Sequence, residues 1–311
     1  MNWLIPGAAI AIFVAIVVTR LLMARTGRTV RTTHLRITVP DLPETVGRVR
    51  IALLSDLHVG ALHVPFDALA EAVDAVCPDV LLLGGDYSAG VTTHPEALAL
   101  IRLLSDGRPT FGVMGNTDRY QQLDEDALGE ILRAGGGDLL VNEVGRVRVG
   151  NTRVEVLGVD DPLHGGDDIS ATLAAASDDA DIRIGLCHSP ALWREVQRLD
   201  AVITVFGHTH GGQVRIPLVE APVTHLTYPT ELAAGLFRYD HPGARPRRLV
   251  DHWEIVSRSE SMRVSTADGP LMYVTRGVGM SPAPVRVFCP PELVYMDIEP
   301  EQSDGVDGDD E

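Results

Sequence analysis

The ten residues VRIALLSDLH, at positions 49–58, place an Asp-x-His pair directly after an apolar run. The run Val49–Leu54 has one charged residue and is otherwise apolar, which is typical of a strand buried on both faces. Asp56 and His58 follow it two positions apart, and extended backbone at that spacing can point both side chains the same way. The stretch therefore predicts a buried strand that delivers two metal-binding side chains to one edge of a sheet.

Similar apolar runs recur along the chain and alternate with amphipathic stretches. Further strands are expected at Val80–Leu83, Thr110–Val113, Val154–Val159, Ile182–Leu186 and Val202–Phe206, and shorter ones at Leu271–Thr275, Val285–Phe288 and Leu293–Ile298. Helices are expected at Phe66–Val76, Pro95–Leu104, Asp124–Arg133 and Ala191–Leu199. Strands that alternate with helices predict an α/β fold.

Polar side chains follow several of these runs at the point where the strand ends. They stand in Gly85-Asp86, in Gly115-Asn116-Thr117-Asp118, at His188, and in Gly207-His208-Thr209-His210. Open α/β sheets bind their ligands at the carboxyl ends of the strands. We therefore expect these side chains to meet at one edge.

The chemistry of this set indicates divalent cations. The candidate ligands are Asp56, His58, Asp86, Asn116, His188, His208 and His210. Carboxylate, amide and imidazole without thiolate suit Mn, Fe, Zn, Co or Ni, and the set does not select among them. Seven ligands exceed what one catalytic ion with an open position needs, so two ions that share a carboxylate are expected.

The order Asp-x-His, Gly-Asp, Gly-Asn-x-Asp, His, Gly-His-x-His resembles the calcineurin-like metallophosphoesterase superfamily over about residues 45–298. The resemblance implies a central β-sandwich with helices on both outer faces. It implies one ion on Asp56, His58 and His210 and another on Asn116, His188 and His208, with Asp86 between them. It further implies metal-mediated catalytic roles for Asp86, Asn116 and His208, and a bridging hydroxide that attacks phosphorus in line.

Further strings are similar to a membrane-associated microbial branch of the superfamily. They are Gly158–Pro162 (GVDDP), Gly207–Gln213 (GHTHGGQ), Arg276–Gly279 (RGVG) and Pro290–Glu292 (PPE). That branch includes phosphodiesterases and UDP-2,3-diacylglucosamine pyrophosphatases. The resemblance implies a phosphorylated small-molecule or lipid-linked substrate.

Thr117 departs from the superfamily pattern, which usually has histidine at that position. That histidine stabilises the transition state or protonates the leaving group, and threonine is no general acid near neutral pH. A weakly basic leaving group needs little protonation, so its hydrolysis suffers least from the loss of this histidine. The substitution therefore favours a phosphoanhydride or activated diester over an alkyl monoester. Arg119, Arg276 and Arg286 are candidates for binding substrate phosphate, with surface arginine as the simpler interpretation. Asp118 orients a neighbouring ligand or caps a turn.

The first residues of the chain predict a membrane anchor. Trp3–Thr19 carries no charge and with Leu21–Ala24 reaches roughly 20 residues, about the length that spans a bilayer. The arginines that follow indicate a single-pass cell-membrane anchor with a cytoplasmic catalytic domain, and a buried core helix is the alternative. The expected organisation is an anchor at 1–24, a linker at 25–33, a catalytic domain at 34–298 and an acidic disordered tail at 299–311.

The amino-acid composition restricts the classes of binding partner. The 311 residues carry a net charge of −17, which disfavours binding to nucleic acid. All 26 basic residues are arginine, as either high-salt adaptation or GC-rich coding would produce. The three scattered cysteines predict no disulfide framework.

The expected function is metal-dependent hydrolysis of a phosphodiester or phosphoanhydride. One alternative is a phosphomonoesterase acting on proteins or small molecules. The other is a non-catalytic scaffold at the membrane, although a scaffold is expected to lose ligands and this chain keeps all seven.

Overall fold

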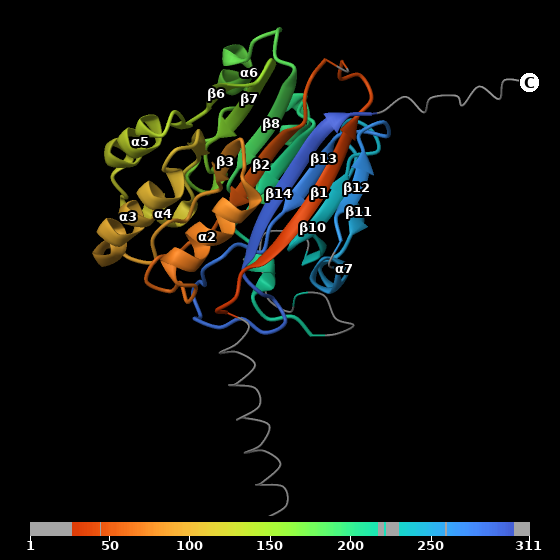
Figure 1. The fold of residues 1–311 in the computed structure, drawn as a ribbon. Coiled ribbons are helices and arrows are strands. Elements are labelled where there is room, and N and C mark those ends of the chain that lie inside the picture. The colour runs from red at the N-terminus through yellow and green to blue at the C-terminus, as the bar shows by residue number, and fades with distance from the viewer. Residues whose placement is uncertain (1–26, 44, 217–220, 222–229, 259, 302–311) are drawn as a thin grey trace, which may run out of the picture.

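The computed structural model describes residues 27–43, 45–216, 221, 230–258 and 260–301 (Figure 1). The predicted anchor, and the acidic tail from residue 302 onward, lie outside the described residues. Within the described ranges, no helix combines the length and apolar character needed to cross a membrane.

Fourteen strands in the described residues form two sheets of seven strands each. The first sheet has the order β12-β1-β14-β2-β3-β4-β5, and the second has the order β11-β10-β13-β9-β8-β7-β6. The strands of the first sheet are β12 (Met262–Ser265), β1 (Arg31–Val39), β14 (Glu292–Pro300), β2 (Val49–Leu54), β3 (Val80–Leu83), β4 (Thr110–Gly112) and β5 (Asp138–Leu139). Those of the second sheet are β11 (Arg247–Val250), β10 (Gly235–Arg238), β13 (Leu271–Val274), β9 (Ile203–Phe206), β8 (Ile182–Cys187), β7 (Thr152–Val159) and β6 (Glu143–Val149).

The direction of the strands decides where loops from both sheets can meet. β2, β3 and β4 run parallel in the first sheet, and β7, β8, β9 and β13 run parallel in the second. β14 is antiparallel to β2 and parallel to β1, so β1 and β14 begin where β2 ends. The carboxyl ends of the parallel strands form one edge of each sheet.

The main core lies between the two sheets. It joins side chains such as Leu53 and Leu82 of the first sheet to Ile184 and Val205 of the second. Because side chains alternate along a strand, Leu54 points to the opposite face and packs under helices instead. Both faces of the central strands are buried, which explains their nearly continuous apolar sequence.

Helices cover the outer face of each sheet (Figure 1). The first sheet packs against α2 (Phe66–Val76), α3 (His94–Ser105) and α5 (Glu125–Ala134). The second packs against α6 (Ile169–Ala175) and the 3₁₀ helices η3 (Pro190–Trp193) and η4 (Glu195–Leu199). The remaining short helices are α4 (Asn116–Gln121), α7 (His252–Ser257), η1 (Val91–Thr93), η2 (Pro162–His164), η5 (His210–Gly212) and η6 (Thr230–Leu232). The predicted mixed α/β fold built on two sheets is confirmed.

Three segments differ from the sequence prediction. The helix expected at Ala191–Leu199 is two 3₁₀ helices, η3 and η4. The strand expected at Val285–Phe288 is absent, since only Val287 forms an isolated bridge. Its alternating pattern arises because Arg286 is buried and bonds to backbone carbonyls, not because one face of a strand is exposed. β1 begins at Arg31, inside the segment expected to be a linker.

Candidate metal centre

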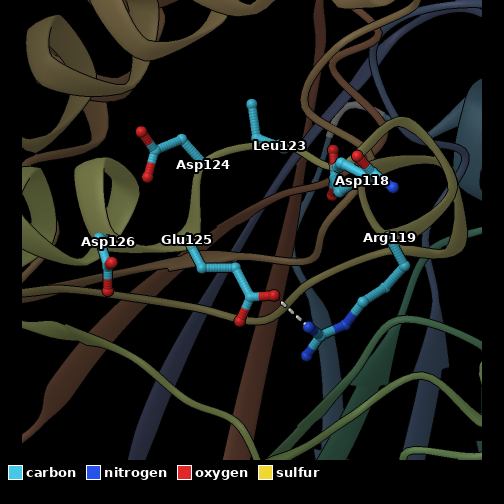
Figure 2. Close-up of a pocket in the computed structure, with 7 residues that line it drawn as sticks. Asp118, Arg119, Leu123, Asp124, Glu125 and Asp126 are labelled. Atoms are coloured by element: carbon cyan, nitrogen blue, oxygen red, sulfur yellow. Dashed lines mark hydrogen bonds and ion pairs between the residues drawn. The ribbon is translucent and has the colours of Figure 1, made fainter.

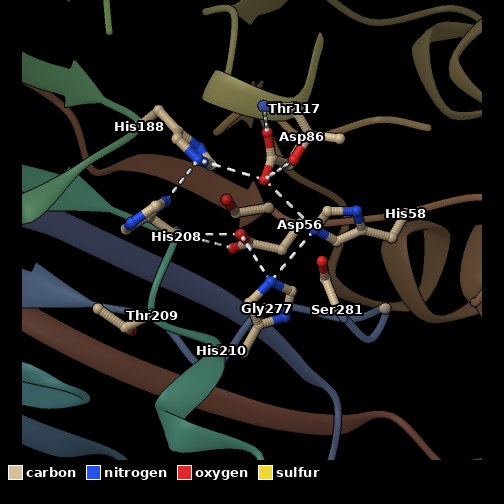
Figure 3. Close-up of polar contacts among 12 residues, drawn as sticks. Asp56, His58, Asp86, Thr117, His188, His208, Thr209, His210, Gly277 and Ser281 are labelled. Atoms are coloured by element: carbon tan, nitrogen blue, oxygen red, sulfur yellow. Dashed lines mark hydrogen bonds and ion pairs between the residues drawn. The ribbon is translucent and has the colours of Figure 1, made fainter. Parts of the chain in front are cut away.

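The predicted ligands follow the carboxyl ends of β2, β3, β4, β8 and β9, in loops and at the starts of α4 and η5. We call this end of the molecule, with its loops, the metal edge. Figure 3 shows the carboxylates of Asp56 and Asp86 between the imidazoles of His188 and His208 on one side and His58 and His210 on the other. Each sheet thus contributes part of one polar cluster.

The charged and imidazole ligands form two groups that share Asp86. One group holds Asp56, His58, Asp86 and His210, and the other holds Asp86, His188 and His208; within each, the ligand atoms all lie within 4.8 Å of one another. One oxygen of Asp86, Oδ2, is 3.3 Å from Nε2 of His58 and 3.5 Å from Nε2 of His188. Asp86 therefore stands between the groups, as the family pattern implies.

The half-buried Asn116 joins the second group. Its Oδ1 lies 2.8 Å from Nδ1 of His208 and 3.1 Å from Nε2 of His188. An amide oxygen directed at two imidazole nitrogens completes a donor set of oxygen and nitrogen. The structure therefore brings all seven predicted ligands together.

These donors fit divalent cations. Nε2 of His58 lies 3.2 Å from Nε2 of His210, and Nδ1 of His208 lies 3.3 Å from Nε2 of His188. Ring nitrogens that converge with carboxylate oxygens supply several lone pairs to one point, which a cation satisfies. Nδ1 of His188 contacts the Gly84 carbonyl at 2.7 Å, which assigns the ring proton to Nδ1 and leaves the Nε2 lone pair facing the cluster.

Backbone strain is concentrated at the ligands. Asp56, His58, Asp86, His208 and His210 all have positive φ values, between 40° and 68°. In the part of the chain that the structure describes, only six other non-glycine residues share this conformation. Such backbone costs about 1–3 kcal/mol per residue and gathers at functional sites, where it aims side chains that a regular strand would misdirect.

Asp118 ties the ligand loops together. Its fully buried carboxylate accepts hydrogen bonds from the backbone N–H groups of Asp86 (2.7 Å), Tyr87 (2.8 Å) and Gly115 (2.9 Å). Burial and then the charge of Asp86 raise the pKa of Asp118 to about 7, against the opposing pull of these N–H donors. Asp118 thus orients the loop of Asp86 and also caps the start of α4 through Gly115, so both interpretations of the sequence apply.

Thr117 contacts the shared carboxylate. Its backbone N–H donates to Oδ1 of Asp86 at 2.8 Å and its hydroxyl donates to Oδ2 at 2.9 Å. The side chain is therefore engaged with Asp86. Next to it, Nε2 of the exposed His164 lies 3.1 Å from the Asn116 carbonyl.

The cluster strongly shifts the protonation of its members. Burial opposes the charge of Asp86, but His188 and His58 outweigh it and hold the pKa of Asp86 well below its usual value. Burial also disfavours the imidazolium forms, but Asp86 outweighs it and raises the pKa values of His58 and His188. Asp56 behaves differently, since burial raises its pKa despite His188 nearby.

The segment around Gly277 closes over Asp56. Gly277 has φ +63°, and a Cβ atom there would lie 2.7 Å from Cβ of Asp56. The N–H of Gly279 donates to the Asp56 carbonyl at 2.6 Å, and the N–H of His208 donates to its carboxylate at 2.9 Å. The glycines of the RGVG string thus permit this approach, a packing role that the sequence motif alone did not disclose.

The arginines considered for substrate have partners inside the protein. Arg119 pairs with Asp160 at 2.8 Å and also with Glu125. Arg276 is 1% exposed and pairs with the buried Glu292 at 2.7 Å. Arg286 is fully buried and donates to the carbonyls of Gly279 and Arg276. Their roles in substrate binding stay predictions.

A cavity of about 490 Å³ lies beside Asp118, where α4 meets α5 (Figure 2). Carboxylates dominate its wall, which is lined by Asp118, Arg119, Gln122, Leu123, Asp124, Glu125 and Asp126. Its one cation, Arg119, is directed at Glu125 in Figure 2. Such a wall disfavours binding of a phosphate anion.

Comparison with known proteins agrees with this geometry. The profile of the calcineurin-like phosphoesterases matches residues 49–212. Phosphodiesterase YaeI of Escherichia coli is 30% identical over 262 residues, which are 80% of this chain and 82% of that protein. The uncharacterized metallophosphoesterase YkuE of Bacillus subtilis is 22% identical over 276 residues, 87% of this chain and 86% of that protein.

A third relative is longer. The zebrafish (Danio rerio) transmembrane protein with metallophosphoesterase domain is 25% identical over 279 residues, 84% of this chain and 55% of that protein. The family profile covers more than half of the 311 residues. The chain therefore belongs to the calcineurin-like phosphoesterase family and is a hydrolase of phosphoester bonds.

Proposed function

We propose that the protein hydrolyses a phosphodiester or phosphoanhydride with two divalent cations. One cation would be held by Asp56, His58 and His210, the other by Asn116, His188 and His208, and Asp86 would be shared. The observation that carries the proposal is the position of Asp86 Oδ2, 3.3 Å from His58 and 3.5 Å from His188. When bound, such cations supply Lewis acidity at phosphorus and activate water.

The protein residues would prepare this site in advance. The lowered pKa of Asp86 keeps its carboxylate ionised, and the two hydrogen bonds from Thr117 fix its orientation. The Gly84 carbonyl holds His188 in the tautomer that a ligand requires. Preorganised groups of this kind need no rearrangement during the reaction.

The engagement of Thr117 bears on the substrate. With its hydroxyl directed at Asp86, residue 117 offers no proton to a departing alkoxide. Phosphate leaving groups and activated alcohols need little such help, which supports an anhydride or activated diester over an alkyl monoester. A phosphorylated small molecule or lipid-linked substrate satisfies this requirement.

We also propose that residues 1–24 anchor the protein in the cell membrane with the catalytic domain in the cytoplasm. The uncharged run Trp3–Thr19 and the arginines after it support this arrangement. Relatives from Danio rerio and Bos taurus carry the name transmembrane protein with metallophosphoesterase domain. Membrane fractionation of the full chain, with protease added to intact and permeabilised cells, tests both the anchor and the side.

The Asp86→Ala variant tests the catalytic proposal. Hydrolysis of bis(p-nitrophenyl) phosphate with Mn²⁺ should fall by at least about 100-fold, because both cations lose a shared ligand. The control is Asp106→Ala, which removes an exposed carboxylate after α3. Equal activity of the Asp86→Ala variant and the control would rule out the proposed centre.

A further inference from the structure

Exposed apolar side chains gather at the metal edge. Over the described ranges, the exposed large apolar residues are Val91, Leu103, Tyr120, Leu163, Ile216 and Phe288. Tyr120 is 81% exposed and Val91 is 65% exposed. Single apolar residues are ordinary on protein surfaces, but a cluster on one face marks an interaction site.

Two of these residues lie on loops of the first sheet. Val91 begins η1, five residues after the ligand Asp86. Tyr120 lies in α4, whose first residue is the ligand Asn116. Leu103 is the exception, because it lies in the last turn of α3, before β4 begins and therefore at the opposite edge.

Two more lie on loops of the second sheet. Leu163 is in η2 directly after β7, and its neighbour His164 contacts the Asn116 carbonyl. Ile216 comes shortly after the ligands His208 and His210. It lies two residues after Val214, which forms an isolated β-bridge with Val287. Exposed apolar residues therefore lie on segments of both sheets that follow strands ending at the metal edge.

Phe288 is held outward by strained backbone. It has φ 51°, which is rare for a bulky residue, and its side chain is 44% exposed. Nε2 of the buried His252 lies 2.8 Å from its carbonyl, and the ring of Trp253 lies 6.2 Å from its own. The fold thus maintains an aromatic pair of Trp253 and Phe288 at this edge at a conformational cost.

The chain also enters the domain at the metal edge. A Cβ atom at Gly27 would lie 3.7 Å from His63, in the β2–α2 loop, and 3.8 Å from Met280, next to the segment that covers Asp56. β1 begins opposite the start of β14, with Arg31 in register with Glu292, and Figure 1 shows both starts at the same end. The uncharged run Trp3–Thr19 precedes this entry point.

Charge favours one kind of lipid surface. A net charge of −17 disfavours a strongly anionic membrane. Exposed Arg28 and Arg31 stand where the chain enters the domain and can reach lipid phosphates. Apolar side chains with only a few local cations match a zwitterionic surface.

We propose that the metal edge is a membrane-contact surface, in which Val91, Tyr120, Leu163, Ile216 and Phe288 enter the headgroup region of a zwitterionic phospholipid bilayer. The proposal rests on the proposed anchor and deepens the proposed function. It places the ligand cluster next to the headgroup layer, so a phosphoester carried by a lipid reaches the metal centre without leaving the membrane.

The test uses the full chain reconstituted in phosphatidylcholine vesicles. In a Cys77→Ser background, which removes the exposed thiol, the environment-sensitive dye NBD is attached at Leu163→Cys or Val91→Cys. Leu103→Cys is the matched control, because it is also exposed but lies at the opposite edge. Doxyl-labelled phosphatidylcholine should quench the dye at 163 and 91 and leave the dye at 103 unquenched.

The outcomes separate this proposal from the proposed function. If the protein floats with the vesicles but the dye is not quenched at 163 and 91, the contact surface is contradicted and the anchor is supported. Equal quenching at all three positions has the same meaning. Failure to float with the vesicles contradicts both the anchor and the surface. Hydrolysis of soluble bis(p-nitrophenyl) phosphate is measured on the same samples; if it is absent while quenching follows the expected pattern, the catalytic proposal alone is contradicted.

Discussion

Thr117 donates two hydrogen bonds to Asp86, one to each carboxylate oxygen, at 2.8 Å from its backbone and 2.9 Å from its hydroxyl. The position that usually carries a catalytic histidine in this superfamily therefore holds the carboxylate of Asp86, which belongs to both candidate ligand groups. This exchange has two consequences that experiments can separate, one for metal binding and one for the leaving group.

Thr117→Val should weaken metal binding. Valine keeps the shape and the backbone N–H but removes the hydroxyl bond to Oδ2 of Asp86. Partners that orient a metal ligand typically contribute 10–100-fold in affinity, so Mn²⁺ affinity should fall by about that factor in calorimetric titration. Thr117→Ser restores a hydroxyl and should bind almost as the parent does. Equal affinity of the valine variant and the parent would show that the hydroxyl bond is irrelevant to the centre.

Thr117→His should widen the range of leaving groups. An imidazole at this position could donate a proton, and general acids contribute about 10²–10⁴-fold where the leaving group is basic. The rate with an alkyl ester should therefore rise relative to the rate with bis(p-nitrophenyl) phosphate, measured side by side with Mn²⁺. If both rates change by the same factor, the missing proton donor does not limit the substrate range.

Gly277→Ala should disturb Asp56. The added Cβ would lie 2.7 Å from Cβ of Asp56, and the alanine would have to adopt φ +63°. The clash and the strained backbone together should lower the free energy of unfolding by about 2–4 kcal/mol and reduce hydrolysis. Gly107→Ala is the matched control, since Gly107 has φ +69° with nothing within 4 Å of the added atom. It should cost only about 1–2 kcal/mol and leave hydrolysis unchanged.

The two glycine variants are compared by urea unfolding and by the bis(p-nitrophenyl) phosphate rate. If both lose the same stability and keep the same rate, the close approach to Asp56 has no functional weight, and only the φ angle matters.

Metal-free and metal-loaded protein should respond to pH in opposite directions. Without metal, Asp86 raises the folded-state pKa values of His58 and His188 above their unfolded value of about 6.5. The favourable interaction of the protonated histidines with Asp86 stabilises the folded state fully below the unfolded pKa. This stabilisation is lost as the pH rises through the raised pKa values. Bound metal requires neutral imidazoles, so its stabilisation grows as the pH rises over the same range.

The measurement is Tm against pH in EDTA and in Mn²⁺. Subtracting one curve from the other cancels groups remote from the centre, so the difference in Tm should widen upward from about pH 6.5. A difference independent of pH would contradict the coupling between these histidines and Asp86.

The strands that support the site could be predicted from the sequence because strands buried on both faces have a nearly continuous apolar sequence. Val49–Leu54 and Val80–Leu83 have the observed bounds, since both faces are buried and the apolar run ends where the ligand loop begins. The ligands follow for the same reason, because each stands directly after such a strand. Periodicity predicted a helix at Ala191–Leu199 but does not distinguish an α-helix from the 3₁₀ pair observed there.

Contacts between segments that lie far apart in the chain could not be predicted from the sequence. Arg276 and Glu292 read as separate polar residues, yet they form a buried pair, and Glu292 also accepts hydrogen bonds from Tyr273 and Thr33. The apolar edge around the cluster was equally hidden. Its members are scattered from Val91 to Phe288, and only the topology gathers them.

The position of β14 also governs when the centre can be built during synthesis. Residues 292–300 lie between β1 and β2, and the segment just before them supplies Gly277 and Gly279 to Asp56. A nascent chain that has exposed all seven predicted ligands but not β14 leaves β2 without its neighbour on one side. Domains fold as units as they leave the ribosome, so we expect the ligand cluster to assemble after residue 300 has emerged.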